Sequence, residues 1–147
     1  MARYEHDGRT AQTKAAVKRL LDARRLQAQH RWRGAMYLGG YGVECKLKAR
    51  LMEKYGLDTL EQLEEEMEHR YRRPINLFTH SIEALFGLTG ARDRLLQGSN
   101  SAALRAFQRC NRWRPAWRYN PDDSTEDECS DSLEAVEEFG RYITNNV

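Results

Sequence analysis

The sequence predicts an all-α fold, an up-and-down bundle of four to five helices with one or two short extra helices. Apolar residues recur at helical spacing in several segments, and no stretch alternates as a strand does. The segment 35–49 is largely apolar yet contains Gly39, Gly40 and Gly42. A glycine inside a helix costs roughly 0.5–1 kcal/mol relative to alanine. We therefore expect neighbouring helices to approach this segment closely, and we place it at the centre of the bundle.

Two long helices are expected first, over residues 10–28 and about 31–54, with a tight turn near residues 28–30. The second helix should end at Gly56, a residue type that favours the position after a helix. Its apolar positions step by four and three residues, which is the spacing of a bundle seam. These positions are Leu38, Gly42, Cys45, Ala49 and Met52.

Shorter helices are expected next. Asp58 with Glu61 resembles a capping box for a helix that Pro74 would end. Thr79 is expected to cap a helix that starts at residue 80 and closes at Gly87 or Gly90, and a further helix should cover 101–113. Ser124 is expected to cap the last helix, whose inward positions again step by four and three. These positions are Cys129, Leu133, Val136, Gly140 and Ile143.

The composition fits one globular domain over residues 1–147, with residues 1–9 expected to form a loose N-terminal arm. The chain is 40% hydrophobic and 31% charged. Its longest run of apolar residues and glycine, residues 35–43, is too short to span a membrane, and the charged amino terminus lacks a signal-peptide pattern. The three cysteines form no CxxC motif. We therefore expect a cytoplasmic protein with reduced thiols, no metal and no cofactor.

The charge is distributed unevenly along the chain. Residues 1–118 contain 23 Lys and Arg against 13 Asp and Glu, whereas residues 119–147 contain one Arg against nine acids. Two interpretations follow. The acidic tail folds back on the basic body, which is the interpretation that the near cancellation favours, or the arginines bind an anionic partner such as RNA.

One acid, Glu44, lies in the middle of the expected central helix, where an unpaired carboxylate would be strongly destabilising. We expect Arg118, from the loop before the last helix, to pair with it. A structural ion pair is the favoured interpretation. The alternative is a functional polar centre in which Tyr41 and Tyr119 join Glu44 and Arg118.

The densest basic stretch, residues 105–118, interleaves arginine with tryptophan and contains no acid. Arginine and aromatic side chains together are typical of surfaces that bind single-stranded RNA. The alternative, which we favour, is that the tryptophans pack in the core or in a dimer interface while the arginines pair with the acids downstream. The candidate RNA-binding residues are Arg105, Arg109, Arg112, Trp113, Arg114 and Trp117.

Three segments resemble a HEPN domain (higher eukaryotes and prokaryotes nucleotide-binding) over about residues 14–57 and 79–144. They are AMYLGGYGVECKLKA preceded by LLDARRL, then FTHSIEALF, and then WRPAWRYNP with the helix that follows. The resemblance implies a helical bundle, a homodimer and a bacterial or archaeal cytoplasmic protein. Many HEPN proteins are metal-independent ribonucleases with an Arg-x4-6-His motif, and many act in toxin–antitoxin or phage-defence systems beside a small nucleotidyltransferase. Others have lost the motif and bind or scaffold.

The chain departs from the ribonuclease motif. Arg118 and Tyr119 align with the catalytic region, but no histidine follows them, so the imidazole needed for acid–base catalysis is missing there. Arg73 and His80 fit the loosest spacing, as does His30 with arginines upstream of it. With 19 arginines in the chain, such spacings arise by chance.

We therefore predict a non-catalytic HEPN-like module that binds RNA or nucleotides, or a protein partner. The first alternative is a metal-independent RNA endonuclease whose site combines His80 with Arg73 or Arg118. The second alternative is a structural oligomeric adaptor that uses its charged clusters within a dimer.

Overall fold

The computed structural model describes residues 8–147 and confirms the all-α class. Within these residues the chain forms seven α-helices and one 3₁₀ helix, and no strand. The elements are α1 (Arg9–Ala28), α2 (Trp32–Lys54), α3 (Leu60–Tyr71), α4 (Ile82–Gly87), α5 (Ala91–Gln97), α6 (Ser101–Cys110), η1 (Pro115–Tyr119) and α7 (Glu126–Asn146).

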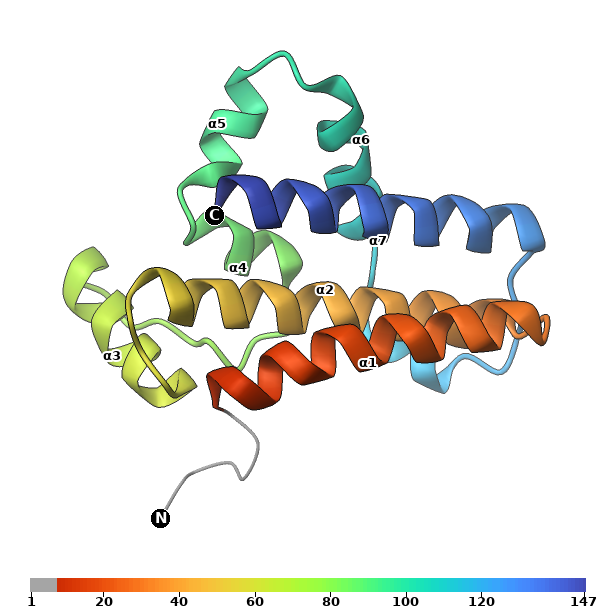
Figure 1. Cartoon of the computed structure of the whole chain (residues 1–147), viewed down its shortest axis with the longest axis horizontal. Coiled ribbons are helices and arrows are strands. Elements are labelled where there is room, and N and C mark those ends of the chain that lie inside the picture. Colours follow the sequence, from red (N-terminus) through yellow and green to blue (C-terminus); the bar gives the residue numbers. More distant parts are fainter. Residues whose placement is uncertain (1–7) are drawn as a thin grey trace.

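Three long helices, α1, α2 and α7, follow the long axis of the molecule, with α2 lying between the other two (Figure 1). The chain reverses between α1 and α2, whereas α7 runs in the same direction as α2. The short helix α4 packs on α2, and α6 packs on α7. Short helices thus occupy the place where a fourth long helix would complete a simple up-and-down bundle.

The glycines of α2 mark positions where other elements approach its backbone, as the sequence predicts. A Cβ atom built on Gly39 would lie 2.7 Å from Leu133 of α7, and one on Gly40 would overlap the Trp113 ring. At Gly42 it would lie 3.3 Å from the carbonyl oxygen of Ala16 in α1. α2 is therefore the central helix, contacted from three sides.

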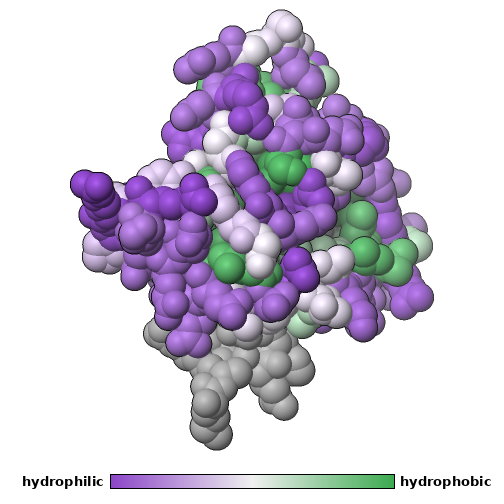
Figure 2. Space-filling view, turned by 60° about the vertical axis from the view of Figure 1, so that its left-hand side comes forward, coloured by the Kyte–Doolittle hydropathy of each residue, from purple (hydrophilic) through white to green (hydrophobic). Residues whose placement is uncertain are grey.

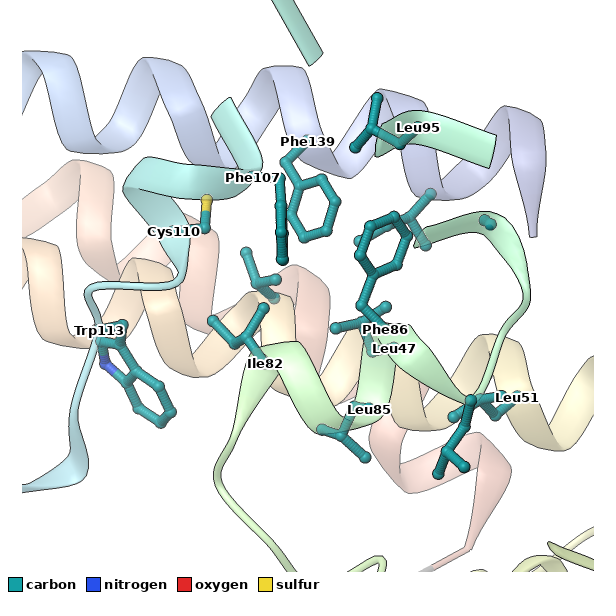
Figure 3. Packing of buried hydrophobic residues seen from close by; sticks show 14 of the residues in the cluster. Leu47, Leu51, Ile82, Leu85, Phe86, Leu95, Phe107, Cys110, Trp113 and Phe139 are labelled. Atoms are coloured by element: carbon teal, nitrogen blue, oxygen red, sulfur yellow. The ribbon is translucent and has the colours of Figure 1, made fainter. Parts of the chain in front are cut away.

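The main core lies between α2, α4, α6 and α7. Its aromatic centre is formed by Phe86, Phe107 and Phe139, whose ring centroids lie 4.9 to 5.4 Å apart (Figure 3). The predicted seam of α7 is buried at all five of its positions. Figure 2 shows a mostly hydrophilic surface with small exposed hydrophobic patches. None of the helices in residues 8–147 has the length and apolar content that crossing a bilayer requires.

Several predicted boundaries are wrong by a few residues. The caps are Thr59, Ser81 and Thr125 in place of Asp58, Thr79 and Ser124, because these three residues have extended backbones and accept the N–H three positions on. The helix expected from residue 80 begins at Ile82 and ends at Gly87, which is one of its two predicted ends. The helix expected over 101–113 ends earlier, at Cys110, and α5 is an additional helix.

The expected N-terminal arm is corrected at its last two residues. Arg9 begins α1, and its backbone N–H donates to the carbonyl oxygen of Asp58 at 2.8 Å. The remainder of the expected arm, residues 1–7, lies outside the described residues.

The side chains of three acids in the acidic tail contact the basic body. Glu137 of α7 pairs with Arg24 of α1, and Asp131 lies 3.8 Å from Arg109 of α6. The carboxylate of Asp123 accepts the backbone N–H of Arg33 at 2.7 Å, and this bond lowers the pKa of Asp123. The interpretation that the tail folds back on the body is therefore supported at these contacts.

We expect Gly40→Ala to destabilise the protein by about 1–3 kcal/mol, because the added methyl group overlaps the Trp113 ring. The matched control is Gly140→Ala in α7, whose added Cβ would meet only the Lys46 ammonium at 3.5 Å. Alanine there should raise the stability by roughly 0.5–1 kcal/mol through its higher helix propensity. Urea unfolding followed by circular dichroism measures both changes. Equal effects of the same sign would contradict the close approach of Trp113.

Candidate functional site

Glu44 is the buried charge around which the candidate site is organised. Its side chain is 2% exposed and has two partners. The Lys48 ammonium, one helical turn further along α2, donates to Oε1 at 2.7 Å. Nδ1 of His80 lies 3.1 Å from each carboxylate oxygen. A buried carboxylate is tolerated when it is paired and hydrogen-bonded in this way.

The predicted polar centre is wrong in half of its members. Arg118 lies on the surface, with its guanidinium 4.7 Å from the centre of the Tyr119 ring, and it does not pair with Glu44. Hydrogen bonds to Tyr119 and Tyr37 raise the pKa of Arg118. Tyr119 is 73% exposed. The short 3₁₀ helix η1 carries both residues away from the carboxylate, and of the four predicted members only Tyr41 and Glu44 stay together.

The segment between α3 and α4 positions His80. Arg72 ends α3 in the left-handed conformation, with φ of 53°. The backbone N–H groups of Ile75 and Leu77 then donate to the carboxylates of Glu68 and Glu64, so the acids of α3 bind this segment to the helix. His80 follows directly before the cap of α4 and is therefore held between two fixed helices.

The contact with Glu44 determines which ring nitrogen of His80 carries a proton. A carboxylate only accepts hydrogen bonds, so Nδ1 carries the proton that it donates to Glu44. This tautomer leaves Nε2 as the nitrogen that can accept a proton. The imidazole side chain is 49% exposed, whereas Glu44 beneath it is buried. His80 is therefore an oriented, accessible base that is hydrogen-bonded to the buried carboxylate of Glu44.

A groove of about 820 Å³ lies over this pair, and we name it the Glu44 groove. α1 supplies Lys14, Lys18 and Arg19, and α2 supplies Tyr41, Glu44, Cys45 and Lys48. Phe78 and His80 lie at the other side. The lining contains four cationic side chains and a single carboxylate, which already has two partners.

The cations of α1 are only partly neutralised. Asp22 lies 3.6 Å from the Lys18 ammonium and 3.2 Å from the Arg19 guanidinium, and it also contacts Arg25 at 3.8 Å. One carboxylate thus serves three cations, while Lys14 is exposed at the rim of the groove. The Glu44 groove therefore offers net positive charge to a ligand.

Burial and the charge of Glu44 act on the neighbouring groups of α2. Burial first, and Glu44 second, raise the pKa of Tyr41 and raise the pKa of Cys45 to about 11. Both groups are therefore protonated near neutral pH. Cys45 is consequently not an activated nucleophile, because the thiolate is the reactive form.

The basic stretch of residues 105–118 divides between core and surface. Trp113 is 3% exposed, packs on Gly40 and donates its indole N–H to the carbonyl oxygen of Tyr37 at 2.9 Å. Figure 3 shows it at the edge of the core. Trp117 is half-buried between the two apolar clusters. The tryptophans therefore pack in the fold, as in the favoured interpretation.

The arginines of this stretch lie at the surface. Arg109 pairs with Asp131, and Arg114 donates to two backbone carbonyl oxygens of the turn after α6. Arg105 and Arg112 are exposed. The structure thus separates these arginines from buried Trp113, so the predicted alternation of stacking rings and guanidinium groups is not presented on one surface.

The other histidine–arginine candidates are not assembled. Arg73 lies over the ring of Tyr71 at 5.8 Å, whereas His80 contacts Glu44, Tyr41 and Trp113. His30 stacks on Trp32 at 5.0 Å. Among residues 8–147 no three His, Cys, Asp or Glu side chains are grouped so that they could hold a metal ion.

Several members of the site had a signal in the sequence that the prediction did not use. Glu44 and Lys48 are four residues apart on one helix face, which is the spacing of an intrahelical ion pair. Lys14 and Lys18 are also four residues apart, and they lie with Arg19 on one side of α1. The contact between Glu44 and His80 had no such signal, since it joins residues 36 positions apart.

Comparisons with models of protein families, with curated proteins and with solved structures find no match to this chain. The resemblance to HEPN domains therefore stays a prediction.

We expect Glu44→Gln to lower the free energy of unfolding by about 3–5 kcal/mol, because Lys48 would remain buried without a counter-charge. Adding Lys48→Met should recover part of this loss, since the unpaired charge is then removed as well. Urea unfolding of the two single variants and the double variant measures the coupling. An effect of Glu44→Gln below about 1 kcal/mol, as for an exposed pair, would contradict the assigned role.

Proposed function

We propose that the Glu44 groove binds a phosphate-bearing ligand, with RNA as the favoured class, and that the protein acts as a non-catalytic binding module. The observation that carries the proposal is the lining of this groove. Lys14, Lys18 and Arg19 face it from one helix, and Lys48 and His80 lie on its other side. Clustered cations with few acids are the electrostatic signature of nucleic-acid binding.

The groove also offers contacts to a base or a sugar. Tyr41 and Phe78 line it beside the cations, and aromatic side chains provide surfaces on which unpaired bases stack. The buried carboxylate supports the site indirectly, because it fixes the side chains of Lys48 and His80 at one wall. A groove with oriented cations and an aromatic wall suits a single strand better than a free phosphate.

This surface is a better candidate than the basic stretch of residues 105–118. In that stretch Trp113 is buried, and the aromatic contact of its arginines at the surface is that of Arg118 with Tyr119. The Glu44 groove combines a hollow, cations and aromatic side chains in one place. We therefore assign the RNA contact to α1 and α2, and not to the candidate residues of the stretch 105–118.

The finer parts of the proposal come from the resemblance to HEPN domains. They are a cytoplasmic location, a homodimer, a small nucleotidyltransferase or another effector as partner, and a role in toxin–antitoxin or phage-defence systems. The presence of such a partner gene beside this one would support them. A purely structural adaptor remains the alternative if the groove binds no ligand.

We expect the protein to bind a single-stranded RNA oligonucleotide with an affinity that falls as salt rises. The double variant Lys14→Ala/Lys18→Ala should bind more weakly, and the slope of log affinity against log salt should fall by about 0.7 for each phosphate that is no longer neutralised. Fluorescence anisotropy measures both quantities. The matched control is Arg112→Ala/Arg114→Ala, which removes two exposed cations from the other basic surface. A weakening confined to that control pair would place binding at residues 105–118 and reject the groove.

A second candidate function is a metal-independent RNA endonuclease, and the Glu44–His80 pair is the observation that favours it. Nε2 of His80 is placed to take the proton of a ribose 2′-hydroxyl, with Glu44 stabilising the imidazolium that forms. The 2′-oxygen would attack phosphorus, the bond to the 5′-oxygen would break, and that oxygen would take up a proton. Lys48 and Arg19 line the same groove as His80 and take the place of Arg73 and Arg118 in this candidate site.

We expect, if this second candidate holds, that the protein cleaves RNA in the presence of EDTA and leaves a 2′,3′-cyclic phosphate. His80→Ala should abolish cleavage, because it removes the base. His69→Ala, at an exposed histidine of α3, is the matched control and should have no effect. Gel analysis of end-labelled RNA follows the reaction. RNA that binds and stays intact with the unaltered protein would reject the endonuclease and leave the binding module.

A further inference from the structure

A hollow of about 680 Å³ lies between α1 and α7, over the second half of α2. Both α1 and α7 pack on α2, and Figure 1 shows them on either side of it. Apolar hollows of roughly 300–1,000 Å³ are the usual size of small-molecule sites. The hollow and the Glu44 groove have no lining residue in common, so they are separate surfaces.

The lining of the hollow is apolar in one part and cationic in the other. Leu20 of α1, Val43 of α2 and Val136 of α7 come together there from three helices. Lys46 and Arg50 follow Val43 along α2, about one and two turns further on. A ligand that fits both parts has an apolar body and one polar head group.

Gly140 of α7 lets the Lys46 ammonium lie inside the hollow. A Cβ atom built on Gly140 would lie 3.5 Å from Nζ of Lys46, so this ammonium lies close to the backbone of α7. Lys46 is half-buried, and burial first, and Arg50 second, lower its pKa. The charged form of Lys46 therefore lacks the stabilisation that water or an anion would give it.

The other charged side chains of the lining have partners. They form three ion pairs, which are Glu53–Arg50, Glu137–Arg24 and Arg141–Glu138. Within residues 8–147 no carboxylate forms an ion pair with Lys46. In the same part of the chain the Nε–H of Arg50 is buried without an acceptor. The cationic part of the hollow is therefore short of one anionic group.

We propose that the hollow binds a small apolar monocarboxylate, with its carboxylate on the Lys46 ammonium and its hydrocarbon part against Leu20, Val43 and Val136. Charge complementarity selects this class of ligand. A neutral apolar compound would leave Lys46 without a counter-charge. A dianion would bring a second charge to a wall whose other cations already have partners.

Octanoate and octanol, which share a hydrocarbon chain and differ in charge, test the class of ligand. Isothermal titration calorimetry of the unaltered protein, without RNA, measures both affinities near neutral pH. We expect octanoate to bind about tenfold tighter or more, which is the size of one charge-assisted contact. Equal affinities, or no binding of either compound, overturn the proposal. Because no RNA is present, neither outcome bears on the function proposed for the Glu44 groove.

Three variants test the assigned contacts. Lys46→Gln should abolish the preference for octanoate and leave octanol binding, because the apolar contacts stay. Lys54→Gln is the matched control and should keep the preference, since Lys54 is an exposed lysine of α2 outside the hollow. Gly140→Leu should block both compounds, because its side chain extends into the hollow. Far-ultraviolet circular dichroism confirms that each variant is folded. A preference for octanoate that persists in folded Lys46→Gln overturns the assignment.

The pH dependence of octanoate binding gives a readout that a packing change would not move. The charged groups that line the hollow around Lys46 are Arg50 and Glu53 on α2 and Glu137 and Arg141 on α7, and α1 adds none. A bound carboxylate raises the pKa of Lys46, so the affinity falls as the pH rises through the lowered pKa of the free protein. Lys46→Arg should bind octanoate without this fall, because a guanidinium stays charged. An affinity of the unaltered protein that stays constant up to about pH 10.4, the ordinary pKa of lysine, contradicts the contact.

Discussion

The burial of one negative charge in the central helix constrains much of this structure. Glu44 lies among apolar neighbours, so its carboxylate needs partners that are themselves held in place. Lys48 is provided by the same helix, whereas His80 is brought from a segment far along the chain. That segment is fixed by α3 on one side and α4 on the other. The candidate site therefore arises because the buried carboxylate needs partners. The hydrogen bond to Glu44 is what orients the His80 ring.

Local patterns in the sequence predicted the helices and the central position of α2, because these depend on residues that are close in the chain. The glycines at positions 39, 40 and 42 of α2 indicated close approach, and each faces a different neighbour. The four-three spacing predicted the buried face of α7. Caps were misplaced because several Ser, Thr and Asp residues compete near each helix start, and only the backbone conformation decides between them.

The candidate site was harder to predict because it depends on contacts between distant segments. Arg118 was expected at Glu44 because an arginine suits a buried carboxylate and its loop could reach the bundle. The 3₁₀ helix η1 directs it outward, and the shorter Lys48 fills the position from one turn away. The packing of Trp113 in the fold was among the interpretations of the sequence. Its contact with Gly40, however, joins two segments far apart in the chain, and no periodic pattern predicts which distant segments meet.

The common direction of α2 and α7 has an electrostatic consequence. Two parallel helices align their macrodipoles, and the antiparallel α1 offsets only one of them, so a net positive end and a net negative end lie at opposite poles of the three long helices (Figure 1). The acids of the first turn of α7, Glu126, Asp127 and Glu128, lie at the positive pole. At the other pole Arg94 donates to the carbonyl oxygen of Asn146. The segregation of charge along the sequence thus compensates a polarity that the parallel arrangement creates, and a chain with its acids evenly spread would lack that compensation.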